Sequence, residues 1–272
     1  MLTLTVCNHK GGTGKTTSSI NLAAALGLSG LNVLVVDLDP QGFLTRMMGV
    51  PEPDPTRSSV VIFDPDMKDG HRPGILELAS FNLLPSSPAL SSGIRKLTRP
   101  VDVLWAREFV QRDVSGYDVL LFDTAAAVTV YSLNALAASD HVLVPVLPEY
   151  QPVVGAEQTW QTARMVSKKL NPSLAEPSFL FTMVDARKRN HHSFRKYMRD
   201  KYGEHVCHSI IRTCTTLSVT NSDGLTVFDR SPHARGAVDY ANAAEEIWAR
   251  AAPAPAPAPA SAVRDQNAEP IR

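Results

Sequence analysis

Short apolar runs alternate with longer stretches of helical periodicity along most of the chain. Several of the runs are apolar on both faces, as strands are when helices cover both sides of a parallel sheet. The expected strands span 2–7, 32–37, 81–84, 117–123, 141–146, 178–183 and 206–211. The expected helices span 15–28, 88–111, 130–138, 152–170, 191–202 and 236–251. This alternation predicts an α/β fold, a doubly wound and mostly parallel sheet that binds its ligand at the carboxyl ends of the strands.

Two segments depart from the alternation. Residues 50–74 are rich in Pro and Asp and lack clear periodicity, so we expect a surface excursion there. From Ala251 the chain becomes Ala-Pro repeats followed by a polar tail. Alternating proline blocks helix and sheet, which predicts an extended, disordered tail over 253–272, to which composition alone assigns no role. The predicted organisation is one domain over 1–252 and this tail.

Composition favours a soluble cytoplasmic enzyme. The chain has 272 residues, of which 44% are hydrophobic, enough for one large α/β domain with a substantial core. Its 27 Lys and Arg balance 27 Asp and Glu, so binding to nucleic acid would have to come from a local patch. We see neither a secretory signal nor an apolar run approaching the roughly 18–20 residues that span a bilayer. The three cysteines are widely spread, which argues against a disulfide scaffold.

A glycine-rich turn between the first expected strand and helix has the sequence Lys10-Gly11-Gly12-Thr13-Gly14-Lys15-Thr16-Thr17. Such a turn leaves backbone N–H groups unpaired at a positive helix end, a geometry that binds phosphates. In the usual pattern G-x-x-x-x-G-K-[ST], the lysine reaches the β- and γ-phosphates and the hydroxyl binds Mg²⁺, roles that fall to Lys15 and Thr16. Here His9 replaces the first glycine, and an extra lysine is present at Lys10. We expect all residues from Gly11 to Thr17 to contact the phosphates.

Acidic residues end two of the expected strands. Asp123 ends a buried strand, where a carboxylate is costly unless it faces a metal or the metal's hydration shell. The competing interpretation is a helix N-cap. Asp37 and Asp39 lie two apart at the end of another apolar strand, so both project toward one end of the sheet. They could instead be turn-forming acids before Pro40.

A basic stretch follows the sixth expected strand. At 100° per residue, one helical face carries His192, Arg195, Lys196 and Arg199, with His191 assigned to the same ridge. The opposite face carries Phe194, Tyr197 and Met198. If the apolar face docks on the protein body, the ridge suits phosphate contacts without base reading. From the residues alone, an ordinary solvated amphipathic face is the favoured interpretation.

Several of these motifs together resemble one family. Residues 8–17 resemble the deviant Walker A motif of the ParA/Soj/MinD family of dimeric ATPases, 33–42 its second motif, and 117–124 its Walker B strand. Further matches are 84–87, 144–146, 182–187 and 235–237, and the 182–187 stretch points to the ParA/Soj partition branch. The similarity covers roughly residues 1–250.

The resemblance implies an ATPase that uses ATP and Mg²⁺ and forms a homodimer when ATP binds. It implies that Asp37 supports the Mg²⁺ shell, with Thr16 and Asp123, while Asp39 orients the attacking water. Lys10 would reach across a sandwich dimer to the partner's phosphates, and Gly11 would allow close approach of the two backbones. Spacing alone leaves Lys10 equally a solvated loop residue.

The resemblance also implies non-specific binding to double-stranded DNA, location on the nucleoid, and stimulation by a ParB-type centromere-binding protein, with no membrane partner. The candidate DNA contacts are Arg187, Arg189, Arg195, Lys196, Arg199 and Arg212. The alternative is a MinD-like ATPase that positions other proteins at a membrane, but it needs a C-terminal amphipathic helix that an Ala-Pro tail does not provide.

Some positions depart from the family pattern. Ala125-Ala126 replaces the proline pair that usually follows the Walker B strand, so that loop is expected to be less rigid. The segment near the adenine reads Ile211-Arg212-Thr213-Cys214, and Thr216 replaces an expected arginine. Contacts to the base are therefore not assigned from the sequence, and part of the usual DNA surface is either missing or moved to Arg212.

Overall fold

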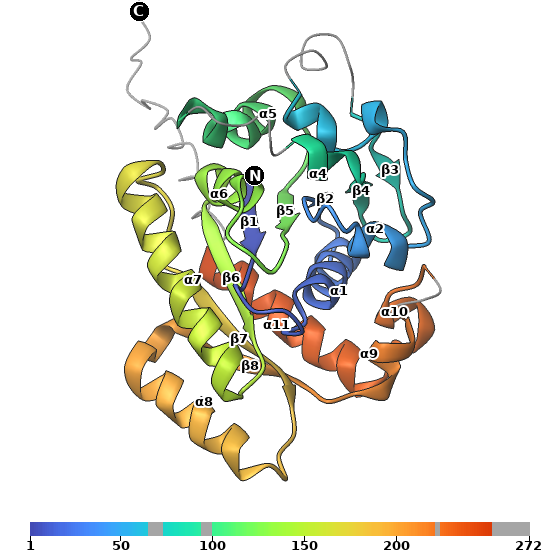
Figure 1. Cartoon of the computed structure of the whole chain (residues 1–272). Coiled ribbons are helices and arrows are strands. Elements are labelled where there is room, and N and C mark those ends of the chain that lie inside the picture. Colours follow the sequence, from blue (N-terminus) through green and yellow to red (C-terminus); the bar gives the residue numbers. More distant parts are fainter. Residues whose placement is uncertain (65–72, 94–99, 221–223, 252–272) are drawn as a thin grey trace, which may run out of the picture.

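The computed structural model describes residues 1–64, 73–93, 100–220 and 224–251. Its strands are β1 (Leu2–Val6), β2 (Val33–Asp37), β3 (Leu76–Glu77), β4 (Asn82–Leu84), β5 (Val119–Asp123), β6 (His141–Val146), β7 (Ser178–Val184) and β8 (Val206–Arg212). They form one eight-stranded sheet in the order β3-β4-β2-β5-β1-β6-β7-β8 (Figure 1). Neighbouring strands are parallel except at the edge, where β3 runs antiparallel to β4. The expected α/β fold with a mostly parallel sheet is confirmed.

Helices cover both faces of this sheet. They are α1 (Lys15–Leu28), α2 (Phe43–Met47), α4 (Ala89–Gly93), α5 (Trp105–Asp113), α6 (Val130–Ala138), α7 (Tyr150–Lys169), α8 (Arg189–Tyr202), α9 (Thr215–Thr220), α10 (Val227–Arg230) and α11 (Arg235–Ala251). Along β5, Leu121 packs into the core beneath α1 and α11, whereas Leu120 and Phe122 pack into the core beneath α5 and α6. Burial on both faces explains why the central strands β2 and β5 are apolar up to the aspartate that ends each of them. Within the described residues, none of the helices combines the length and apolar character needed to cross a membrane.

The carboxyl ends of the three central strands lie next to one another. In the parallel register, Val6 of β1 pairs with Asp123 of β5, and Asp123 pairs in turn with Asp37 of β2. The turn after β1 leads directly into α1. This edge of the sheet therefore brings the glycine-rich turn and the strand-end acids together, as the fold class predicts.

The predicted helix over 88–111 is wrong. The structure ends α4 at Gly93, forms a 3₁₀ turn over Pro100–Leu104 and begins α5 at Trp105. The sequence already opposes a continuous helix at Pro100, because a proline in a helix interior lacks the N–H that the helix needs. The short elements β3, α2, α9 and α10 were also not predicted, because two to six residues carry too little periodicity to detect.

The surface excursion expected over 50–74 is wrong for part of that segment. Ser59–Ile62 form a 3₁₀ turn, and Val60, Val61, Ile62 and Phe63 are all buried. The Phe63 ring lies against Tyr131, with ring centroids 4.7 Å apart, and both belong to the core beneath α5 and α6. A run of four apolar residues was hidden among prolines and aspartates. Residues 65–72 and the predicted tail over 253–272 lie outside the described residues.

Candidate nucleotide site and basic surface

The glycine-rich turn places free backbone N–H groups at the start of α1. Gly12 and Gly14 have left-handed backbone angles, φ 71° and φ 80°, which side chains other than glycine rarely adopt. Gly14 is the N-cap of α1, and no side chain caps that end. The N–H groups of the first helical turn therefore lack side-chain partners, and together with the helix dipole they favour an oxyanion at this point.

Contacts from three other strands and helices hold the turn in place. The Asn8 side chain donates to the Pro145 carbonyl and accepts from the Lys10 N–H, at 2.8 and 2.9 Å. Thr182 of β7 donates to the Thr13 carbonyl at 2.8 Å. Gly155 of α7 lies against the turn so closely that an added Cβ would be 2.8 Å from Asn8 Oδ1. The loop is thus built before any ligand arrives.

The two lysines of the turn have different surroundings. Lys15 is 8% exposed, and its Nζ donates to the Lys10 carbonyl at 3.2 Å. Burial lowers the pKa of Lys15, while the nearby carboxylate of Asp123 acts in the opposite direction. The Lys10 side chain is exposed. Lys15 is therefore positioned to serve the phosphate site of its own turn, whereas Lys10 is accessible to another molecule.

Two buried carboxyl groups lie beside the turn. Asp123 accepts from Thr16 Oγ1 at 2.9 Å and from Ser19 Oγ at 2.7 Å. Asp37 accepts from the N–H and the hydroxyl of Thr45, at 3.0 and 2.7 Å. Burial raises the pKa of Asp123 to about 6, and burial followed by repulsion from Asp123 raises the pKa of Asp37 to about 7.

This group of oxygens suits a hard divalent cation. Two adjacent buried acids are costly because each charge is desolvated and repels the other, and a cation between them and the phosphates would relieve both costs. The Thr16 hydroxyl and the Asp123 carboxylate are already within hydrogen-bond distance of each other, and oxygen ligands of this kind are those that Mg²⁺ prefers. The residues present therefore fit Mg²⁺.

Asp39 lies just beyond the carboxyl end of β2 and is half-buried. Its Oδ1 accepts from the Gln41 N–H at 2.9 Å, and its carbonyl accepts from Ser86 Oγ at 2.6 Å. Its own N–H donates to Asp37 Oδ1 at 3.0 Å. The three strand-end acids Asp37, Asp39 and Asp123 are thus brought to the same edge of the sheet.

The sequence analysis assigned no role to five residues that shape the site: Asn8, Ser19, Thr45, Gly155 and Thr182. Signals existed for three of them, because Ser19 follows Thr16 by three positions and so shares its helix face, while Asn8 and Thr182 lie in the matched stretches 8–17 and 182–187. For Thr45 and Gly155 no local pattern existed, since each reaches the site from a separate element. A pocket of about 240 Å³ adjoins the turn between Gly14 and Thr17 on one side and Met183, Thr213 and Leu217 on the other. Its mainly apolar walls suit a flat heterocyclic base.

The basic helix α8 differs from the predicted division into two faces. Met198 is buried as expected, and His192, Lys196 and Arg199 are exposed. Tyr197 is 43% exposed rather than docked, because its hydroxyl reaches out to donate to Glu157 of α7. His191 is buried and is not part of the ridge.

Arg195 is also more enclosed than the predicted ridge requires. Its guanidinium lies 5.9 Å from the centre of the Phe181 ring, so the side chain is half-buried. Much of the remaining basic charge is paired. Arg187 binds Asp185, Lys196 binds Asp200, and Arg212 binds Asp239 on α11. A count of basic residues in the sequence therefore overestimates the unpaired positive charge of this surface, because acidic side chains form ion pairs with several of them.

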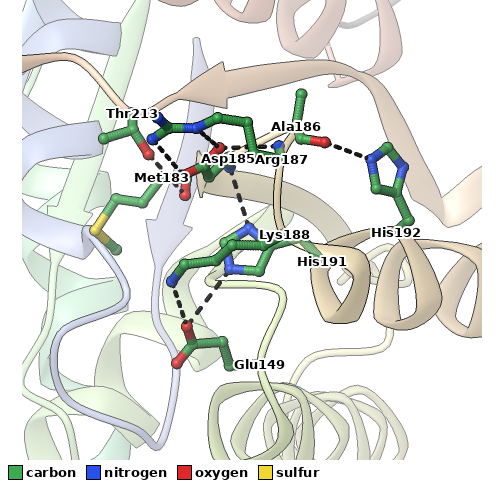
Figure 2. Close-up of polar contacts among 9 residues, drawn as sticks. All are labelled: Glu149, Met183, Asp185, Ala186, Arg187, Lys188, His191, His192 and Thr213. Carbon is green, nitrogen blue, oxygen red and sulfur yellow. Dashed lines mark hydrogen bonds and ion pairs between the residues drawn. The ribbon is translucent and has the colours of Figure 1, made fainter.

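The turn from β7 to α8 is fixed by a network that Figure 2 shows. The Asp185 N–H donates to His191 Nδ1 at 3.1 Å, which leaves the proton of the neutral ring on Nε2, 3.4 Å from Glu149 Oε1. Lys188 donates to the same Glu149 oxygen at 3.2 Å. Met183, the only described residue other than glycine with a left-handed φ (49°), accepts at its carbonyl from the Thr213 hydroxyl. The start of α8 is therefore tied to α7 and to the turn after β8.

Comparisons with known proteins agree with this geometry. A family model described as an AAA domain matches residues 1–176. The sporulation initiation inhibitor Soj of Bacillus subtilis is 33% identical over 254 residues, covering 90% of this chain and 97% of that protein. The chromosome-partitioning ATPase Soj of Thermus thermophilus is 35% identical over 247 residues, covering 91% and 95%.

A solved structure with the same fold holds a ligand of the expected kind. Cobyrinic acid a,c-diamide synthase of Mycobacterium smegmatis, with a bound ATP analogue and magnesium, superposes with a TM-score of 0.73 at 26% identity. The match covers 90% of this chain and 93% of that one. The chain has a glycine-rich turn and paired strand-end acids, and its relatives match it over nearly their whole length. It therefore belongs to the ParA/Soj family of P-loop ATPases.

Proposed function

We propose that this ATPase drives the partition of a chromosome or plasmid through an ATP-dependent grip on DNA. The observation that carries the proposal is the site where the uncapped start of α1, the buried Lys15 and the adjacent acids Asp37 and Asp123 meet. This constellation suits a nucleoside triphosphate with a divalent cation. The partition role is inferred from relatives such as the chromosome-partitioning ATPase Soj of Thermus thermophilus.

In this proposal the turn from Gly11 to Thr17 binds the phosphates, with Lys15 as the charge beside the β- and γ-phosphates. Thr16 and Asp123 would hold Mg²⁺, and Asp37 would support its hydration shell. The cation would neutralise charge that develops on the transferred phosphoryl group. Asp39 orients the attacking water. This role requires a carboxylate that lies near the γ-phosphate and is not buried within the sheet. Its half-buried position beyond the end of β2 suits that role.

The active state in this proposal is a face-to-face dimer. Lys10 is exposed beside the phosphate site, and its backbone, not its ammonium group, contacts Lys15. Gly11 is exposed too, and an added Cβ there would lie 3.9 Å from Ala126 in the loop after β5. An ammonium group that is free in one copy can stabilise transition-state charge in another. ATP would thus complete two sites at once by bringing two copies together.

The basic surface around α8 and the turn before it would then grip DNA. Arg187, Arg189, Arg195, Lys196, Arg199 and Arg212 are the proposed contacts. Contacts of this kind to phosphates carry no sequence information. Binding would be non-specific, in the cytoplasm and on the nucleoid, and a ParB-type partner would stimulate hydrolysis and release. No membrane takes part.

The test is DNA binding measured with ATP, with ADP and without nucleotide, on two duplexes of unrelated sequence. We expect binding with ATP only, with equal affinity for both duplexes. Lys15→Ala, which removes the charge at the phosphates, should abolish binding in every condition. Binding that is equally strong with ADP, or absent with ATP, would contradict the proposed function.

A further inference from the structure

A cleft of about 470 Å³ lies between the turn after β7, α8, the end of β8 and the start of α11. Four arginines from these separate elements line it: Arg187, Arg195, Arg212 and Arg235. Asp185 is the one acid among its lining residues. Arg235 is the first residue of α11, so the positive end of that helix faces the same region. The cleft lies beside the basic helix and adjoins the pocket proposed for the base, with which it shares Arg212 and Thr213.

The positive charge of the cleft is only partly neutralised inside the protein. Asp185 is bound by Arg187 through two side-chain hydrogen bonds, and Asp239 is bound by Arg212. Arg195 differs, because its Nε is buried and has no hydrogen-bond partner within the described part of the chain. Burial, followed by repulsion from Arg199, lowers the pKa of Arg195. A buried guanidinium N–H without an acceptor is costly, so the charge of Arg195 is incompletely compensated inside the protein. An anion bound in the cleft, beside the Arg195 side chain, would offset that charge.

The walls of the cleft are held in place without a ligand. The turn that carries Asp185 and Arg187 is fixed by His191 and by the contact of Thr213 with Met183, as Figure 2 shows. Arg212 is fixed to α11 through its bonds to Asp239. Two of the four arginines, Arg187 and Arg212, are therefore ordered without a ligand, which reduces the conformational entropy that they lose on binding.

We propose that this arginine cleft binds a single phosphate group, and that its occupant in the ATP-bound protein is a phosphate of the DNA backbone. Guanidinium groups present planar, paired donors that match phosphate oxygens, so arginine rather than lysine is the residue suited to such a site. The choice of DNA rests on the proposed function. According to this inference, the main contact with DNA lies in the cleft between α8 and α11. It does not lie on the outward face of α8, where Lys196 is paired with Asp200.

The test compares Arg235→Ala with Arg199→Ala by fluorescence anisotropy of a labelled duplex in the presence of ATP. Both changes remove one exposed arginine, but only Arg235 lines the cleft. We expect Arg235→Ala to weaken binding about tenfold and to reduce the salt slope by about one, while Arg199→Ala has a clearly smaller effect. Thermal unfolding of both variants confirms that each is folded. Equal losses from the two variants would overturn the assignment of the cleft as the anchor.

A second arm uses inorganic phosphate and distinguishes a free phosphate from DNA. It is performed in the Lys15→Ala background, so that the phosphate site of the glycine-rich turn does not contribute. We expect phosphate to raise the melting temperature of Lys15→Ala, and this rise to be lost when Arg235→Ala is added. A rise that survives in the double variant overturns the cleft as a phosphate site.

The two arms also separate this inference from the proposed function. If phosphate protection depends on Arg235 but DNA binding does not, the DNA half of the inference is overturned and a free phosphate is the occupant. If the wild-type chain does not bind DNA with ATP at all, the proposed function fails. The phosphate arm still decides whether the cleft binds phosphate.

Discussion

At the scale of single residues, the groups proposed to hold the nucleotide differ in their surroundings from Asp39, which is proposed to place the water. Lys15 donates to the Lys10 carbonyl of the turn, and Thr16 donates to Asp123. Asp39 is half-buried and lies at the edge of the site. Loss of Asp39 should therefore affect hydrolysis and leave nucleotide binding in place.

The corresponding prediction concerns Asp39→Ala. We expect its rate of ATP hydrolysis to fall roughly a hundredfold or more, because the attacking water is no longer oriented, while its affinity for ATP stays within a few-fold of wild type. Phosphate release and binding of a fluorescent ATP analogue measure the two quantities. The control is Asp54→Ala, which removes an acid that only caps a 3₁₀ turn at the surface. Hydrolysis at the wild-type rate would show that Asp39 has another role.

The residues of the phosphate site could be predicted because they are contiguous in the chain or end a strand. Lys15 and Thr16 follow from the glycine-rich turn, and Asp37 and Asp123 from apolar runs that each end in an acid. Thr45 and Gly155 could not be predicted, since each joins the site only when the strands are ordered in the sheet. The same holds for the pairing of Arg212 with Asp239, which are 27 residues apart.

At the scale of elements, the predicted helices and strands agree best with the structure where the hydrophobic periodicity of the sequence is strongest. α1 and α6 were predicted with their observed ends, since apolar residues recur through each and Gly14 and Thr129 mark their starts. The segment over 59–63 was mistaken for surface because its flanking prolines and aspartates are typical of loops. Tertiary packing against Tyr131 decided its place.

That correction can be tested with Phe63→Ala. Phe63 is 3% exposed and lies against the Tyr131 ring, so its removal should lower the free energy of unfolding by about 3–4 kcal/mol. Arg57→Ala, an exposed position in the same segment, should change it by less than about 0.5 kcal/mol. Urea unfolding measures both. If Phe63→Ala lowers the free energy of unfolding as little as Arg57→Ala does, Phe63 is not part of the core.

The link between α11 and β8 should make stability depend on pH. Glu246 of α11 accepts from the N–H groups of His208 and Ser209 and from Arg250. Burial opposes the charged form of Glu246, but these hydrogen bonds outweigh it and lower its pKa to about 2 from an ordinary value of 4.5. Since the folded pKa is the lower one, the stabilisation is complete above pH 4.5 and is lost as the pH falls toward 2.

Glu246→Gln should therefore cost about 1–2 kcal/mol near neutral pH, after allowance for screening by solvent. The difference from wild type should shrink as the pH falls below about 4.5. Urea unfolding at pH 7, 4.5 and 3.5 follows this difference, under conditions where both proteins remain folded at zero urea. If the difference in free energy of unfolding between wild type and Glu246→Gln stays constant across the pH series, the charge of the Glu246 carboxylate does not stabilise the packing of α11 on β8.

At the scale of the whole molecule, the phosphate site and the basic surface lie on connected elements. Gly155 of α7 lies against the turn that carries Lys10, and Glu149, immediately before α7, contacts Lys188 and His191 at the start of α8. Nucleotide binding and the surface proposed for DNA thus share one helix. The sequence indicated both surfaces and the helix over 152–170, but only the folded chain shows that this helix contacts both surfaces.

The central claim is that ATP brings two copies together through Lys10, and light scattering coupled to size exclusion tests it most directly. The sample is Asp39→Ala, which should retain ATP, with Mg²⁺ and either ATP or ADP. We predict twice the single-chain mass of 29.5 kDa with ATP and the single-chain mass with ADP. Adding Lys10→Ala should return the ATP sample to the single-chain mass. A single-chain mass for Asp39→Ala with saturating ATP would contradict the account.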